Sequence, residues 1–211
     1  MNSPLYLSVV PADSPHFFER TGEHRRVSNW SDQSQVHRAV MSLFPDTDGT
    51  ARSDLGVLYR VDRLPNRPSV VLVQSSVPPR PVAGLRTRDC TGVLEHVPVG
   101  TRLRFRTQVN AVRNNKGRRS PIRVGGPDGG PELLDWLSAR LHGVADVTID
   151  SAVIERFTTR GGGSSQRTTV FTVIVDGTVN VTDAQVLADQ QRSGLGRARA
   201  FGCGLISYAR A

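Results

Sequence analysis

The 211-residue sequence has few cysteines, few aromatic residues and almost no lysine. Its two cysteines, Cys90 and Cys203, are too few and too far apart for a disulfide framework or a zinc knuckle. No apolar run approaches the roughly 18 residues that cross a bilayer, and no basic and apolar signal-peptide pattern opens the chain. We therefore expect a cytoplasmic protein without a membrane segment.

Positive charge is what the chain has in excess. It carries 27 basic and 19 acidic residues, which gives a formal charge of +8 and an isoelectric point near 10.8. All the basic residues except Lys116 are arginines, which the codon usage of a GC-rich genome would explain. Codon usage does not explain the net excess, which favours a polyanionic partner through attraction and counterion release.

The last eighteen residues combine glycine and arginine in a pattern that favours phosphate binding. Four glycines and two arginines precede an apolar run over 205–208: Gly194, Gly196, Arg197, Arg199, Gly202 and Gly204. Backbone N–H groups of glycine loops bind anions, and guanidinium groups add paired donors. The spacing fits neither a dinucleotide fingerprint, whose third glycine position is Arg199, nor a P-loop. We therefore expect a nucleic-acid backbone as ligand, and no bound cofactor.

Hydrophobic periodicity predicts an α+β fold in the first half of the chain. It predicts a helix from Ser31 to Phe44, capped by Asp32 or Ser31, and a loop over residues 11–30. Residues 82–97 give little helical signal. Strands are predicted over 5–10, 57–61, 69–75 and 101–112, the last with Arg102, Arg104 and Arg106 on one face, where they are either basic ligands or simply solvated.

The second half repeats this order of elements. The pattern predicts a weak strand over 121–124, helices over 132–141 and 183–191, strands over 147–158 and 168–181, and a final strand over 201–208. Both halves follow the ferredoxin-like order, although they share no detectable sequence repeat. We predict two tandem ferredoxin-like (RRM-like) βαββαβ domains, 1–112 and 113–211.

Short segments spaced along nearly the whole chain carry a resemblance to a known family. They are 5–8, Val36-His37-Arg38, 43–45, 57–61, 71–75, 98–106, 117–122, 133–137 and the glycine tract 194–205. In this order and spacing the sequence resembles the CasE family, the repeat-RNA endoribonucleases of type I-E CRISPR systems.

The resemblance implies a function as well as a fold. Members of that family cut the CRISPR repeat transcript beside its hairpin without a metal ion. They keep the processed guide RNA (crRNA) and join the other subunits of the Cascade surveillance complex. The resemblance also implies tandem ferredoxin-like domains, and it places the family's catalytic histidine, in the first helix, at His37.

Histidine suits this chemistry, because the 2′-OH of RNA can attack the adjacent phosphate once a side chain moves the protons. Of the five histidines, only His37 lies on a predicted rigid element beside an arginine. Without the resemblance, a surface or half-buried helix histidine with no chemistry is the simpler interpretation. Family members often have a tyrosine three residues earlier, where this chain has Ser34. Positioning would then fall to Ser34, to an arginine such as Arg38 or to Lys116, or the enzyme is slow.

The other basic residues form two candidate RNA-binding groups. The first lies at the predicted domain junction, where a solvated linker is the alternative: Arg113, Lys116, Arg118, Arg119 and Arg123. The second flanks a predicted hairpin tip: Arg156, Arg160 and Arg167. Contacts to an A-form stem would go mainly to phosphates and shape.

Two other classes of function compete with the nuclease. A non-catalytic RRM-like RNA-binding module is suggested by Phe201–Tyr208, which is faintly similar to an RRM aromatic strand, but the chain has few aromatic residues to stack bases. A nucleotide- or metal-dependent enzyme is disfavoured by the glycine spacing and by the lack of clustered histidine and acidic residues.

Overall fold

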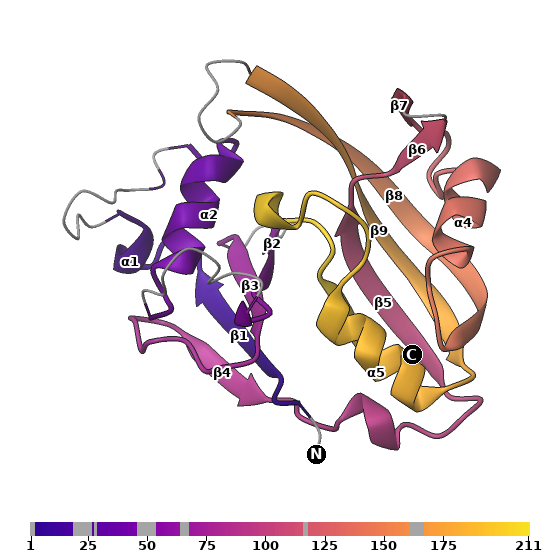
Figure 1. Ribbon diagram of the computed structural model, residues 1–211, viewed down its shortest axis with the longest axis horizontal. Helices are drawn as coiled ribbons and strands as arrows, with labels where there is room; N and C mark the ends of the chain where they lie inside the picture. Colours follow the sequence, from indigo (N-terminus) through magenta and orange to yellow (C-terminus); the bar gives the residue numbers. More distant parts are fainter. Residues whose placement is uncertain are drawn as a thin grey trace. The chain divides into compact units, whose positions relative to one another are not determined.

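Two four-stranded sheets organise the chain in this computed structural model, each within its own compact unit (Figure 1). The structure describes residues 3–18, 27, 29–45, 54–63, 68–115, 118–160 and 167–211, with the backbone alone at 115, 118, 158–160, 167 and 168. The first unit comprises Met1–Gly92, Phe157–Thr168 and Arg199–Gly202. The second comprises Val93–Arg156, Thr169–Ala198 and Cys203–Ala211.

The sheet of the first unit has the strand order β2-β3-β1-β4, with antiparallel neighbours. Its strands are β1 (Tyr6–Pro11), β2 (Leu58–Asp62), β3 (Val70–Ser75) and β4 (Arg86–Asp89). This is the ferredoxin-like order, although the described residues 76–85 that join β3 to β4 contain no helix. The second helix of the predicted βαββαβ order is therefore absent here, and β4, which lies within the stretch 82–97 of weak helical signal, was not predicted as a strand.

Helix α2 (Gln33–Met41) covers one face of this sheet. Asp32 begins it, because its side chain accepts hydrogen bonds from the backbone N–H groups of Ser34 and Gln35. Val36 and Val40 are fully buried and join a core with the β2 and β3 residues Tyr59, Val61, Val71 and Val73. The prediction of a loop over residues 11–30 is wrong at Pro15–Phe18, which form the short helix α1. This helix buries Phe17 in the same core.

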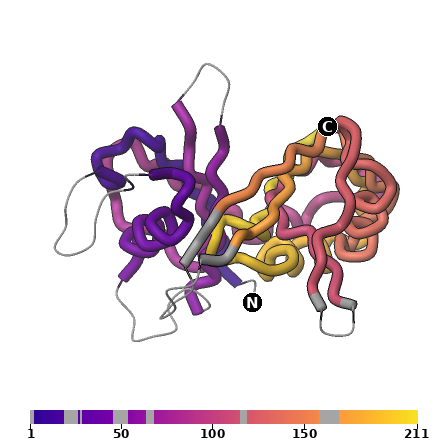
Figure 2. The backbone as a smooth tube through the Cα atoms, turned by 90° about the horizontal axis from the view of Figure 1, so that it is seen from above, coloured from indigo at the N-terminus to yellow at the C-terminus, as the bar shows by residue number. Residues whose placement is uncertain are grey.

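The second unit repeats the topology with the order β10-β5-β9-β8. Its strands are β5 (Arg102–Val109), β8 (Val144–Arg160), β9 (Arg167–Val181) and β10 (Ile206–Arg210). The end of β8 from Phe157 and the start of β9 to Thr168 are assigned to the first unit. Helices α4 (Pro131–Ser138) and α5 (Ala184–Ser193) pack on the face that carries Leu103 and Phe105. A separate two-stranded ladder of β6 (Val112–Asn115) and β7 (Arg118–Pro121) is visible in Figure 2.

The structure corrects the predicted assignment of β5. The alternation of this strand is as predicted, with Leu103 and Phe105 buried and Arg102 and Arg104 exposed. However, β5 pairs with β9 and β10, so it opens the second sheet instead of closing the first. The division therefore falls at Gly92–Val93 and not near residue 113. No helix within the described ranges is long and apolar enough to span a membrane.

Two further predicted strands differ from the structure. The weak strand over 121–124 is instead β7, which pairs with β6 in its own ladder. The final strand begins at Ile206, because residues Arg199–Phe201 form a 3-10 helix, η2, that belongs to the first unit. A second 3-10 helix, η1 (Leu94–His96), precedes β5.

Candidate functional site

His37 lies on α2 against the ring of Tyr59 from β2. The two rings stack with their centroids 6.3 Å apart and an interplanar angle of 28°. Tyr59 is fully buried, whereas His37 is only partly buried, with its Nδ1 atom shielded from solvent. One face of the imidazole is therefore fixed by the sheet, and the residue keeps an exposed part.

The hydroxyl of Tyr59 ties this helix and strand to η2. It donates to the carbonyl oxygen of Ala200 at 3.1 Å and lies 3.4 Å from both the carbonyl oxygen and Oε1 of Gln33. Tyr59 and Ala200 are 141 residues apart in the sequence. Phe201 is held as well, through an edge contact with Phe157 at a centroid distance of 6.4 Å.

Gly202 allows η2 to come this close. Its φ is +76°, a value that L side chains rarely adopt, and a Cβ atom there would lie 3.3 Å from Cε2 of Tyr59 and 3.4 Å from Oε1 of Gln33. The structure thus brings two predicted residues of the glycine tract, Arg199 and Gly202, into the unit that contains His37. Arg199 is partly exposed.

The positioning candidates lie beside His37 on the same helix. Ser34 is one turn before it, so the two side chains share a helix face. The N–H of Ser34 donates to Oδ1 of Asp32 at 3.0 Å, which fixes its backbone in the first turn. Arg38 is exposed, and Lys116 falls outside the described residues.

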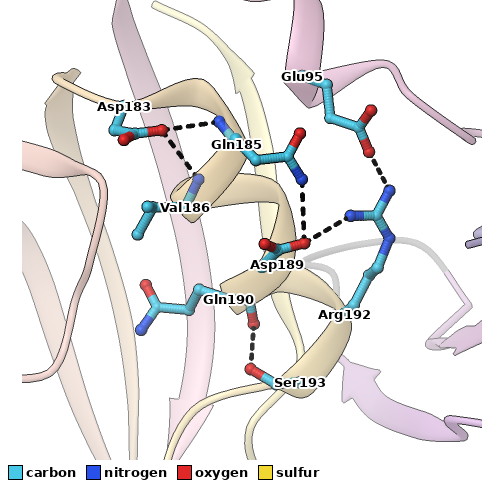
Figure 3. Close-up of polar contacts among 8 residues, drawn as sticks. All are labelled: Glu95, Asp183, Gln185, Val186, Asp189, Gln190, Arg192 and Ser193. Carbon is cyan, nitrogen blue, oxygen red and sulfur yellow. Dashed lines mark hydrogen bonds and ion pairs between the residues drawn. The ribbon is translucent and has the colours of Figure 1, made fainter. Parts of the chain in front are cut away.

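The first part of the glycine tract follows α5, whose polar contacts fix where the helix ends (Figure 3). Asp183 caps its start by accepting from the N–H groups of Gln185 and Val186, both at 3.0 Å. Near its end, Arg192 donates to Asp189 at 3.0 Å and pairs with Glu95 of η1. These contacts anchor the last turn, so that Gly194 can leave the helix with a φ of +71°.

A pocket of about 550 Å³ lies at this end of α5. Gly194 and Gly196 line it together with Arg140 and His142, two residues that the sequence analysis missed. The Arg140 guanidinium sits 4.2 Å from the centre of the Trp136 ring, and its Nη1 donates to the Trp136 carbonyl oxygen at 3.0 Å. Arg140 therefore places a positive charge beside the glycine loop, and the Asp189 carboxylate also lines the pocket.

Two glycines of the tract use their N–H groups inside the protein. The N–H of Gly194 donates to the carbonyl oxygen of Gln190, and that of Gly204 to the carbonyl oxygen of Gln108, both at 2.8 Å. Neither donor is available to a phosphate. These two glycines shape the loop through backbone contacts within the protein.

Cys203, within the tract, is fully buried. Burial raises the pKa of its thiol, and the nearby Glu155 carboxylate adds to this effect. The residue is therefore a packing thiol and not a nucleophile. Among the described residues, no three histidine, cysteine or acidic side chains gather into a metal site.

The remaining basic candidates all belong to the second unit where the structure describes their side chains. Arg113 pairs with Glu132 at 3.2 Å, and the guanidinium of Arg156 lies 5.9 Å from the centre of the Phe171 ring. Arg119, Arg123 and Arg197 are exposed. The side chains of Arg118, Arg160 and Arg167 lie outside the described part of the chain.

Comparison with known proteins decides the family. The model of a family described as "CRISPR associated protein" matches residues 5–210. The CRISPR system Cascade subunit CasE of Escherichia coli (strain K12) is 30% identical over a 200-residue alignment, and the match covers 85% of this chain and 94% of the relative. The chain belongs to the CasE family. The family that the sequence segments predicted is confirmed.

Solved structures with the same fold include two that cover nearly all of this CasE family chain. Thermus thermophilus Cse3, bound to an RNA representing a pre-cleavage complex, has a TM-score of 0.69 at 20% identity, over 98% of this chain and 99% of that one. Cas6e from Escherichia coli str. K-12 has a TM-score of 0.62 at 22% identity, and the match covers 98% of this chain and 100% of that one. The predicted tandem ferredoxin-like fold is confirmed.

The residues that sequence reasoning missed in this CasE family member had weak signals. Tyr59 lies two residues before Val61 on a predicted strand, so both could be assigned to one core face, but Tyr59 could not be placed against His37. Arg140 follows Trp136 by four residues, a spacing at which side chains meet on a helix. That spacing indicated contact between the two, but not a pocket with the glycine loop.

Proposed function

We propose that this CasE family protein is a metal-independent endoribonuclease that cleaves CRISPR repeat transcripts beside a hairpin. The 2′-OH upstream of the scissile phosphate attacks that phosphate, which leaves a 2′,3′-cyclic phosphate and a 5′-OH. The observation that carries the proposal is a partly exposed histidine, His37, held against Tyr59 beside η2, in a chain that matches the family over residues 5–210.

Each group near His37 has a role in this reaction. His37 moves a proton, either from the attacking 2′-OH or to the leaving 5′-oxygen. Arg199 and Arg38 supply positive charge for the phosphorane, and Ser34 orients the RNA in place of the family's tyrosine. Tyr59 does not move a proton, because its buried hydroxyl donates to the Ala200 carbonyl. It positions the imidazole.

The exposed arginines and the pocket at the end of α5 hold the RNA backbone. Arg119, Arg123, Arg156 and Arg197 are exposed, and Arg140 is held at the glycine loop. After cleavage the protein keeps the crRNA hairpin and joins the other Cascade subunits, in the cytoplasm where transcripts are made. Slow turnover is tolerable for a protein that cuts once and retains its product.

A repeat RNA with a single 2′-deoxy nucleotide upstream of the scissile phosphate tests the mechanism. In EDTA the protein should cleave the all-ribose hairpin and leave the deoxy hairpin intact, because the nucleophile is gone. Both RNAs should bind with equal affinity. Cleavage of the deoxy RNA, or strict dependence on added divalent metal, would overturn the mechanism. Binding of both RNAs with no cleavage of either would identify a non-catalytic RNA-binding module.

A further inference from the structure

Another pocket, which lies in the first unit, is lined by two aromatic side chains, although the chain as a whole has few aromatic residues. Its volume is about 310 Å³, near the lower end of the range of roughly 300 to 1,000 Å³ that small ligands occupy. The residues that line it are Ala12, Asp13, Phe18, Trp30, Val61, Arg63, Pro68 and Ser69. Phe18 is 41% exposed to solvent, and among the described residues it is the one aromatic in the set of exposed large apolar side chains.

Hydrogen bonds and ring packing hold part of the wall of this pocket in place. Trp30 sits in a turn closed by two hydrogen bonds: Asp32 N–H donates to the Asn29 carbonyl oxygen at 2.9 Å, and Ser31 N–H donates to Asn29 Oδ1 at 2.8 Å. Its ring packs edge-on against the buried Phe17, with centroids 5.2 Å apart. Of the other lining residues, Ala12 donates its backbone N–H to the carbonyl oxygen of Ser69 at 2.8 Å, which joins the segment after β1 to the segment before β3.

We propose that this pocket binds one unpaired nucleobase of the RNA. Trp30 and Phe18 offer flat apolar surfaces for stacking, which every base can use. Asp13, an exposed residue of the lining, offers carboxylate oxygens that accept from base N–H groups and repel phosphate, so the pocket suits a base better than an anion. Arg63, which also lines the pocket, is exposed and adds positive charge that favours the attached RNA backbone.

The site lies close to His37 along the fold. Val61 lines the pocket and Tyr59 stacks on His37, and the two occupy the same face of β2 two residues apart, which is about 7 Å along a strand. Trp30 comes three residues before the first residue of α2, the helix that carries His37. The inference rests on the proposed function: the base it binds belongs to the single strand that flanks the hairpin near the cut.

Tryptophan fluorescence tests the pocket without any cleavage. The other tryptophan, Trp136, is 5% exposed in the second unit and its ring contacts Arg140. All variants are therefore compared within one Trp136→Phe background, in which Trp30 is the reporter. A short unstructured RNA should quench Trp30 and saturate, whereas the same RNA made entirely of abasic nucleotides should not. Replacing Trp30 by Ala should weaken binding of the base-bearing RNA by about 5- to 150-fold, and replacing it by Phe should restore most of the affinity.

Two further variants keep the test decisive if Trp30→Ala folds poorly. Phe18→Leu removes an exposed ring and should weaken binding of the same RNA. Val153→Ala, at a residue of β8 that is 55% exposed, should leave that binding unchanged. Equal binding and quenching by base-bearing and abasic RNA would overturn the pocket. If hairpins are cleaved without quenching, the pocket alone is wrong. If Trp30 is quenched but no hairpin is cleaved, the pocket stands and the proposed nuclease is wrong.

Discussion

Tyr59 joins three separate segments around the histidine. Its ring stacks on His37, and its hydroxyl holds Ala200 of η2 while lying against Gln33 of α2. The residue therefore couples the geometry of the imidazole to that of a loop distant in the sequence. A change in η2 should affect His37 through this side chain, even where no atom of η2 touches the imidazole.

Gly202→Ala tests this coupling at a single residue. The added Cβ would lie 3.3 Å from Tyr59 and must displace either η2 or the Tyr59 ring. The positive φ also costs about 1 kcal/mol or more of stability for an L side chain. We expect a lower free energy of unfolding in urea and, in addition, slower cleavage of a repeat hairpin at saturating protein.

Gly100→Ala is the matched control. Gly100 has a similar positive φ of +84°, but a Cβ atom there would meet nothing within 4 Å. This variant should lose similar stability and cleave at the parent rate. Equal cleavage by the two variants would show that the approach of η2 to Tyr59 does not matter to the reaction.

At the residue scale, the sequence predicted His37 but not its surroundings. The histidine came from its place in a helical pattern and from the family resemblance. Its contact with Tyr59 depends on how α2 packs on β2, and the tie to Ala200 depends on residues 141 positions further along the chain. The local spacing of residues predicts neither contact, because both arise from tertiary packing.

The helices that carry the candidate site were predictable because local residues determine where they begin. Asp32 and Asp183 each accept from two backbone N–H groups at the start of α2 and α5. The apolar spacing of Val36 and Val40 then selects the buried face of α2. Helix α1 was missed, because four residues around one buried phenylalanine give no periodic signal.

The pairing of the strands was less predictable than their existence. The alternation in β5 identified its buried side, yet a strand's own period does not say which neighbour it will join. In the structure its partners are β9 and β10, both from the C-terminal half. Arg106 of β5 forms an ion pair with Asp176 of β9 at 3.4 Å, a cross-strand interaction that only the register reveals.

For the molecule as a whole, the excess positive charge should act through particular arginines. Replacing Arg119 and Arg123 together by Gln removes two exposed charges of the second unit. The affinity for a non-cleavable hairpin should fall, and the slope of log K against log salt should become shallower by about one unit for each phosphate that an arginine no longer neutralises. Filter binding across a salt series measures both.

Replacing Arg86 and Arg88 by Gln provides the comparison. Both residues are exposed on β4, and this pair changes the net charge by the same amount. Its salt slope should stay at the parent value. If both pairs lower the slope equally, net charge alone attracts the RNA, and the arginines near β7 have no special role.

The central claim is that His37 performs the proton transfer in RNA cleavage. Single-turnover cleavage of a repeat hairpin in EDTA by the parent protein and by His37→Ala tests it most directly, with RNA affinity measured alongside. We expect the rate to fall by a factor of about 10² to 10⁴, while the affinity changes by less than about tenfold, because the arginines and the glycine loop are untouched. Cleavage by His37→Ala at the parent rate would contradict the account.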